Sequence, residues 1–316
     1  MISTLIEQAL HEAQELAKPM LHTGKVASYI PELAKTPSSH LGACVMTMQG
    51  EYICVGDWQH RFTLQSVSKT ITLILALQLV GVDELFSKIG VEPTGDAFNS
   101  LVRLETKSYY PYNPMINAGA IVASSYCVAY DNNAYDKFLK LARKLCNNEK
   151  IGIDNNVYKS EDITGHRNRS IAYLLQAEGV LRCDTDKALD FYFKMCSTLV
   201  NCKDLAHFSC VLAGNGKNPQ TGEVLLESWI ARIVKTLMLT CGMYEASGRF
   251  AMKAGIPAKS GVGGGIMACV ENKIGIATYG PALNSEFSSV GGVIIIEYLS
   301  KKLGLHLLGG NVSYSS

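Results

Sequence analysis

The stretch that decides how this chain is interpreted is Phe62-Thr63-Leu64-Gln65-Ser66-Val67-Ser68-Lys69-Thr70. It follows a β-rich run, residues 44–55, and precedes an apolar, helix-like run, residues 71–82. If a helix begins near Ser66, the Ser66 hydroxyl and the Lys69 ammonium lie one turn apart on one face. A serine with an amine one turn on is typical of a nucleophile with its own base. Taken alone, S-x-x-K also arises by chance, and Ser66 is then a helix N-cap and Lys69 a solvated charge.

Composition limits the class of protein. The chain has 316 residues, of which 47% are apolar and 18% charged, which is typical of a globular protein with a substantial core. A net charge of +1 with dispersed Lys and Arg gives no support for binding nucleic acid or a membrane surface. The longest apolar run of the first third, residues 71–82, is too short to span a bilayer.

The ten cysteines show no metal-site or redox pattern. None forms a C-x-x-C pair, and none lies in a Cys/His cluster with zinc-ligand spacing. The N-terminal residues lack the basic and apolar regions of a secretory signal. We therefore expect reduced cysteines in a soluble, cytoplasmic protein without a metal site.

The order of elements predicts an α+β fold. Residues 2–16 have helical spacing, and residues 44–48 and 52–55 read as a hairpin around a turn at 49–51. The middle of the chain is mainly helical, and the β pattern then returns at 266–270 and 274–279, before an apolar helix at 288–303. Helices are expected in the middle at residues 121–129, 135–146, 171–178, 187–212 (as one helix or two) and 226–241. Both ends thus supply strands to one antiparallel sheet, with a helical lobe between them.

Two further segments carry unusual composition. Residues 109–119 contain three tyrosines, two prolines and two asparagines directly before a predicted helix. Residues 258–265, Ala-Lys-Ser-Gly-Val-Gly-Gly-Gly, allow a backbone to approach a ligand closely, and the Val262 N–H is a candidate oxyanion donor. Each segment alone reads more simply as a Pro/Asn turn or a flexible glycine turn.

A Ser-x-x-Lys helix early in the chain and a Lys-Ser-Gly strand late in it resemble the serine β-lactamase and penicillin-recognising fold. A narrower resemblance covers residues 24–305, to the glutaminase family of serine-dependent L-glutamine amidohydrolases. Five strings carry it in the right order: Phe-Thr-Leu-Gln-Ser-Val-Ser-Lys, Tyr-Asn-Pro-Met-Ile-Asn-Ala-Gly-Ala, Ser-Glu-x(6)-Asn-Arg, Cys-Gly-Met-Tyr-Glu-x-Ser-Gly and Ala-Lys-Ser-Gly-Val-Gly-Gly-Gly.

This resemblance implies roles for nine residues. Ser66 would be the nucleophile and Lys69 its base, with Tyr244 as a proton relay and the N–H groups of Ser66 and Val262 as the oxyanion hole. The substrate L-glutamine bears an α-ammonium, an α-carboxylate and a neutral amide, so a carboxylate, amides and phenols suit it. The substrate-binding positions implied are Tyr29, Ser66, Asn117, Glu161, Asn168, Tyr192, Tyr244 and Val262.

Without the resemblance each binding residue has an ordinary explanation. Tyr192 would be a core aromatic, Glu161 a solvated loop carboxylate and Asn168 a turn residue, and Tyr29 lies in a short, turn-like segment. Two other functions stay open on the residues: another serine acyl-enzyme of the same fold, and a non-catalytic amino-acid sensor.

The resemblance also implies organisation. We expect one glutaminase domain over residues 1–316, with an α/β lobe from 1–65 and 250–316 and a helical lobe from 66–249. The family commonly forms homodimers or homotetramers and needs no metal or organic cofactor. The chain shows no ankyrin repeats or long N-terminal extension, which favours the bacterial stand-alone type.

Overall fold

The computed structural model describes residues 2–101 and 110–309. The tyrosine- and proline-rich loop predicted at 109–119 falls within this part except for Tyr109, which lies outside the described residues. The α-helices are α1 Ile2–Ala17, α2 Ser68–Phe86, α4 Asn117–Tyr130, α5 Ala134–Cys146, α6 Asn155–Thr164, α7 His166–Ala177, α8 Thr185–Cys196, α9 Cys202–Ala213, α10 Ser228–Cys241, α11 Ser247–Lys253 and α12 Val290–Leu303. Short 3₁₀ turns are η1 Lys18–Thr23, η2 Leu33–Lys35, η3 Gln65–Val67 and η4 Tyr244–Ala246.

The main sheet joins strands from both ends of the chain. Its strands are β1 Gly42–Thr47, β2 Tyr52–Gly56, β5 Ala258–Ser260, β6 Gly265–Val270 and β7 Ile274–Tyr279. They are ordered β2-β1-β7-β6-β5 and every neighbouring pair is antiparallel. The two predicted hairpins and the single antiparallel sheet are therefore confirmed. A small second sheet pairs β3 Phe62–Thr63 with β4 Leu199–Val200.

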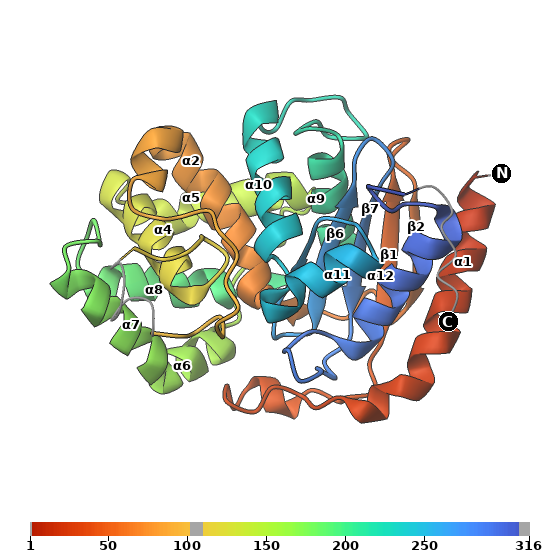
Figure 1. Cartoon of the computed structure of the whole chain (residues 1–316), viewed down its shortest axis with the longest axis horizontal. Helices are drawn as coiled ribbons and strands as arrows, with labels where there is room; N and C mark the ends of the chain where they lie inside the picture. The colour runs from red at the N-terminus through yellow and green to blue at the C-terminus, as the bar shows by residue number, and fades with distance from the viewer. Residues whose placement is uncertain (1, 102–109, 310–316) are drawn as a thin grey trace.

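Alternate residues of a strand point to opposite faces of the sheet, and each face packs against different helices. On β1, Ala43 and Val45 pack in the core formed with α1 and α12, whereas Cys44 and Met46 pack in the core that includes α9. Successive residues of a strand point to opposite faces, so a strand buried on both faces needs this continuous apolar run. Figure 1 shows α1 and α12 beside the sheet and the helical lobe of α4 to α8 on the other side of the molecule, with α2 joining the two parts.

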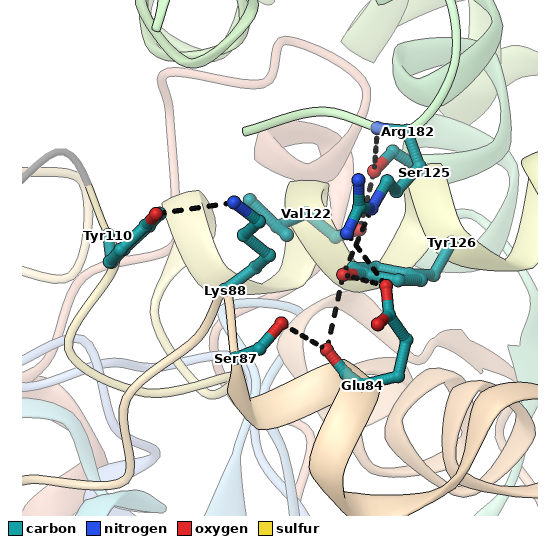
Figure 2. Close-up of polar contacts among 8 residues, drawn as sticks. All are labelled: Glu84, Ser87, Lys88, Tyr110, Val122, Ser125, Tyr126 and Arg182. Atoms are coloured by element: carbon teal, nitrogen blue, oxygen red, sulfur yellow. Dashed lines mark hydrogen bonds and ion pairs between the residues drawn. The ribbon is translucent and has the colours of Figure 1, made fainter. Parts of the chain in front are cut away.

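A polar network anchors the far end of α2 in the helical lobe. Arg182 donates to Glu84 at 2.7 Å and to the Tyr126 hydroxyl at 3.1 Å, and that hydroxyl donates back to Glu84 at 3.0 Å. Figure 2 shows these contacts, which link α2 to α4 and to the segment before α8. They hold the last turn of α2 beyond Gly81, where the backbone departs from helical geometry with φ 77°.

One expectation about the cysteines is wrong. Cys44 and Cys54 face each other across β1 and β2, with their Cα atoms 4.1 Å apart, and form a disulfide. The hairpin register places them opposite each other, and side chains of such close cross-strand pairs are within bonding reach. The other cysteines are free thiols: Cys127, Cys146, Cys183, Cys196, Cys202, Cys210, Cys241 and Cys269.

Close packing of β7 on α9 generates a stability prediction. A Cβ added at Gly275 would lie 2.3 Å from the Cys210 nitrogen and 2.5 Å from the Ala206 oxygen, both backbone atoms. Gly275→Ala should therefore lower the free energy of unfolding by about 1–3 kcal/mol or more through overpacking. At Gly152 a Cβ meets nothing within 4 Å. Chemical denaturation of Gly152→Ala as the control should show little change; equal stability of the two variants would contradict this packing.

Candidate active site

Ser66 lies in a tight turn rather than at the start of a helix. The turn η3 contains Ser66, and the α-helix α2 begins only at Ser68. Gln65 has φ 48°, a left-handed conformation that is uncommon for a residue with a side chain. Ser66 is 6% exposed and caps no helix. The alternative of Ser66 as an ordinary N-cap is thereby excluded.

Lys69 is buried beside this turn. Its side chain is 1% exposed, and its Nζ donates to the Met115 carbonyl at 3.1 Å and to Asn117 Oδ1 at 2.7 Å. Burial lowers the pKa of Lys69 to about 8, although Cys196 and Glu161 oppose the shift. The alternative of a solvated surface charge is excluded, and a neutral amine becomes accessible near neutral pH.

The contacts of Lys69 explain the unusual loop before α4. Met115 belongs to that loop and Asn117 is the first residue of α4, so the loop delivers two acceptors to one amine. Asn117 then uses its Nδ2 to donate to Asn168 Oδ1 at 2.9 Å. These successive hydrogen bonds, from Lys69 to Asn117 and from Asn117 to Asn168, determine whether the oxygen or the nitrogen of each side-chain amide faces its partner.

The glycine-rich segment after β5 lies directly against Ser66. A Cβ at Gly261 would be 2.7 Å from the Leu64 oxygen and 3.4 Å from the Ser66 nitrogen. The absence of a side chain there lets the backbone at Val262, which is 4% exposed, come beside the turn that contains Ser66. The two backbone N–H groups predicted to form an oxyanion hole are thus brought to one place.

Tyr244 contacts both Ser66 and the Val262 backbone. It opens the turn η4 with φ 53°, again left-handed, and is 8% exposed. Burial raises the pKa of its phenol well above the usual value, and contacts with Ser66 and the Val262 backbone partly oppose this. Its oxygen completes no hydrogen bond of ordinary geometry among the described residues. The phenol is therefore close to Ser66, protonated and available as a donor.

A second buried lysine supports Tyr244. Lys259 Nζ lies 4.5 Å from the centroid of the Tyr244 ring and donates to the carbonyls of Gly242 at 3.2 Å and Ser260 at 2.6 Å. Burial lowers the pKa of Lys259 well below its usual value, and the charge of Lys69 adds to the shift. Two carbonyls and an aromatic face are three acceptors for an ammonium, which counters the cost of burial.

Glu161 presents an unpartnered carboxylate oxygen to the cavity. The side chain is 5% exposed, and Oε1 has no hydrogen-bond partner among the described residues. Burial raises the pKa of Glu161 to about 7, opposed by a hydrogen bond from Gln65 and by the charge of Lys69. A buried carboxylate with a free oxygen is suited to receive a cationic group from a ligand.

One cavity collects most of the predicted binding residues. Its lining includes seven of the nine: Tyr29, Ser66, Asn117, Glu161, Asn168, Tyr192 and Val262. Lys69 lies behind this wall, bonded to Asn117, and Tyr244 lines an adjoining cavity that shares Phe98 with it. All nine residues are therefore brought together.

Tyr29 and Tyr192 enter the cavity in different ways. Tyr29 is 50% exposed, yet burial of its hydroxyl end raises the pKa of the phenol, and Glu161 raises it further. Tyr192 on α8 is 3% exposed, and burial raises its pKa strongly as well. Both phenols are thus hydrogen-bond donors in the working pH range.

Several lining residues were not predicted from the sequence: Ile30, Gln65, Phe98, Asn99, Thr164, Gly165, Arg167 and Cys196. Gln65 and Arg167 adjoin Ser66 and Asn168 in sequence, and this adjacency was a usable signal. Cys196 gave none, because a thiol in an apolar helix looks like a core residue. Burial raises the pKa of this thiol, so it stays protonated and is a poor nucleophile beside Ser66.

The described residues contain no group of three or more His, Cys, Asp or Glu arranged to hold a metal ion. In the same part of the chain no helix has both the length and the apolar character needed to cross a membrane.

Comparisons with known proteins agree with one another. The sequence profile of the family described as Glutaminase matches residues 24–308. A glutaminase of Clostridium botulinum (strain Loch Maree / Type A3) is 51% identical over 286 residues, which are 90% of this chain and 94% of the relative.

Solved structures give the same result for the fold. The probable glutaminase ybaS superposes with a TM-score of 0.89 at 36% identity, over 96% of this chain and 99% of that one. Bacillus subtilis glutaminase YbgJ, in a covalent complex with 5-oxo-L-norleucine, superposes with a TM-score of 0.86 at 35% identity, over 95% and 98% of the two chains. The α+β, β-lactamase-like fold predicted from the sequence is confirmed, and the chain belongs to the glutaminase family of amidohydrolases.

Proposed function

We propose that this glutaminase hydrolyses the side-chain amide of L-glutamine to L-glutamate and ammonia through a covalent ester on Ser66, with Lys69 as the base. One observation carries the assignment. The Ser66 turn, the buried Lys69–Asn117 pair and the unpartnered Glu161 carboxylate converge on a single cavity.

The first half of the reaction forms the ester. Neutral Lys69 takes the Ser66 proton, and Ser66 Oγ bonds to the side-chain amide carbon of glutamine. The N–H groups of Ser66 and Val262 stabilise the resulting oxyanion. The C–N bond then breaks, and the nitrogen leaves as ammonia after it receives a proton from Lys69 or through the Tyr244 phenol.

The second half regenerates the enzyme. Water attacks the γ-glutamyl ester, with its proton accepted by the same Lys69–Tyr244 pair, and glutamate leaves as Ser66 regains its proton. This sequence requires no metal or organic cofactor. The covalent complex of Bacillus subtilis YbgJ with 5-oxo-L-norleucine, formed from 6-diazo-5-oxo-L-norleucine, supports covalent chemistry on this fold.

The amino-acid end of glutamine is held by the opposite part of the cavity. Glu161 pairs with the α-ammonium, which explains its unpartnered oxygen. Asn117, Asn168 and the phenols of Tyr29 and Tyr192 hydrogen-bond the α-amino and α-carboxylate groups. Such buried polar groups reject ligands that cannot satisfy them.

We extend the proposal to organisation and location. Residues 1–316 act as one domain, which is supported by a site built from both the sheet side and the helical lobe. Family resemblance supports a homodimer or homotetramer, which light scattering measures directly. Eight of the ten cysteines are free thiols, most of them buried, which supports a cytoplasmic location, although the Cys44–Cys54 disulfide is more typical of an oxidising compartment.

Loss of the nucleophile is the first test of the mechanism. Ser66→Ala should lower kcat for ammonia release from glutamine by about 10³-fold or more, because no covalent ester forms. The coupled ammonia assay is run beside Ser124→Ala, a buried serine in α4 away from the cavity, which should keep its activity. Near-normal turnover by Ser66→Ala would refute the proposed nucleophile; glutamine-induced stabilisation of the parent protein without turnover would indicate a sensor.

The pH profile tests the base and the ammonium site together. Lys69 must be neutral and Glu161 ionised, so kcat/KM should rise with pH through about 7 and about 8. Glutamine bound to Glu161 keeps it ionised, so kcat should show only the limb near pH 8. Steady-state kinetics from about pH 6 to about pH 9 give the pH profiles of kcat/KM and of kcat separately. A kcat that falls as pH rises through about 8 would contradict Lys69 as a base.

Substrate analogues test the role of Glu161. Glu161→Gln should lower kcat/KM for glutamine by about 30- to 1,000-fold, the cost of unpairing a buried charge. The same change should matter little for glutaric acid monoamide, which keeps the amide and one carboxylate but lacks the α-ammonium. Equal losses on both substrates would place the ammonium elsewhere.

A further inference from the structure

Among the described residues other than glycine and asparagine, those with left-handed backbone lie at or beside the active site. Six non-glycine residues of the described ranges have positive φ, and three of them are asparagines, which tolerate it: Asn147, Asn215 and Asn272. The other three are Gln65 at 48°, Tyr244 at 53° and Phe287 at 59°. Gln65 precedes the nucleophile, and the Phe287 ring lies 5.4 Å from Phe98, which lies 4.9 Å from Tyr244.

Gln65 and Tyr244 are each held by a serine three residues later. The Ser68 hydroxyl donates to the Gln65 carbonyl at 2.6 Å, and the Ser247 hydroxyl donates to the Tyr244 carbonyl at 2.7 Å. Both serines are buried, at 0% and 4% exposure. Ser247 also accepts from the Met243 N–H at 3.0 Å and so closes a ring of bonds around Tyr244. Each arrangement lies at a 3₁₀ turn, η3 and η4.

A serine bonded to a nearby carbonyl is common in itself. Ser125 makes the same contact to Val122 at 2.7 Å within α4 (Figure 2), and Ser124 bonds the Ala120 carbonyl at 2.8 Å. Val122 and Ala120 have ordinary helical backbone, so there the bond has no unusual conformation to hold. At η3 the acceptor residue, Gln65, is left-handed and adjoins Ser66. At η4 the acceptor residue, Tyr244, is left-handed and itself carries the phenol.

We propose that Ser68 and Ser247 are positioning residues that hold Gln65 and Tyr244 in left-handed conformations, so that the Ser66 hydroxyl and the Tyr244 phenol face each other. This inference rests on the proposed function of Ser66 and Tyr244. Left-handed backbone in a residue with a side chain persists only where its surroundings enforce it. Without the hydroxyl, Gln65 or Tyr244 relaxes toward negative φ, and the turn carries its reacting group away.

The two positioning bonds act on different groups. Ser68 acts through the Gln65–Ser66 peptide, and its hydroxyl also contacts the Cys196 thiol. Ser247 acts through the backbone on both sides of the Tyr244 turn, at the Tyr244 carbonyl and the Met243 N–H. Because most of the side chains proposed to hold the amino-acid end of glutamine lie on α4, α6, α7 and α8, loss of either hydroxyl should slow the chemical step more than it weakens binding.

The direct test compares kinetics with stability. Ser68→Ala and Ser247→Ala should each lower kcat by about 10- to 100-fold, the effect of a displacement of about 1 Å, with KM within about 3-fold of the parent. Ser124→Ala is the matched control: it removes an equally buried hydroxyl–carbonyl bond and should leave kcat unchanged. Thermal unfolding should shift alike in all three. A kcat loss no larger than that of the control would overturn the proposal.

A double-mutant cycle separates the two serines. In a Tyr244→Phe background, Ser247→Ala should cost about 2-fold or less in kcat, because the hydroxyl that it positions is gone. Ser68→Ala should keep its full effect there. A full, additive effect of Ser247→Ala in that background would overturn the proposed route through Tyr244.

Two further experiments test the same inference: cysteine variants, for the case that an alanine variant does not fold, and a crystal structure that shows the backbone of Tyr244. If an alanine variant does not fold, Ser68→Cys and Ser247→Cys replace the hydroxyl by a thiol of similar size and weak donor strength, and the same loss of kcat is expected. A crystal structure of Ser247→Ala should show Tyr244 outside the left-handed region; unchanged φ with unchanged kcat would refute the inference. Activity retained in Ser66→Ala would instead refute the proposed function itself.

Discussion

The structure depends on one buried amine. Lys69 is almost fully removed from water, and its Nζ is held by the Met115 carbonyl and Asn117 Oδ1. Taking an ammonium out of water is costly, so burial favours the neutral form and lowers the pKa of Lys69 to about 8. That single constraint requires a loop to deliver acceptors at the start of α4. It also places the proposed base three residues after Ser66.

The topology brings the remaining groups to that amine. Ser66 follows the first hairpin, whereas Val262 and Tyr244 come from the last quarter of the chain. Because β5 joins the sheet through β6 and β7 to β1, the glycine-rich segment after β5 returns to the turn that opens α2. Helices α6 to α8 supply Glu161, Asn168 and Tyr192 from the other side. In the proposed mechanism the fold therefore separates the chemistry, at the sheet boundary, from the residues of the helical lobe that would hold the amino acid.

Much of this arrangement could be predicted from the sequence. Apolar, β-rich runs on either side of tight turns located both hairpins, and the antiparallel sheet followed from them. Five family strings contain seven of the nine residues that the fold brings together, and the wider resemblance implied the other two, Tyr29 and Tyr192. Helices α6 and α11 were missed, because α6 is polar and α11 is one of the shortest helices.

Other features depend on three-dimensional context. The sequence predicted a helix beginning near Ser66, but Gln65 turns left-handed first and α2 starts at Ser68. The Cys44–Cys54 pair depends on hairpin register, and the placing of Lys259 under the Tyr244 ring depends on tertiary packing. No local propensity encodes such contacts, so a single sequence does not reveal them.

Reaction with 6-diazo-5-oxo-L-norleucine, followed by peptide mapping with mass spectrometry, tests most directly whether Ser66 is the nucleophile and Lys69 its base. The reagent carries the amino-acid end of glutamine and a carbon that captures a nucleophile. We expect one adduct, on Ser66, which forms faster as pH rises through about 8 because Lys69 loses its proton. An adduct on Cys196, the thiol in the same cavity, or on any other residue would contradict it.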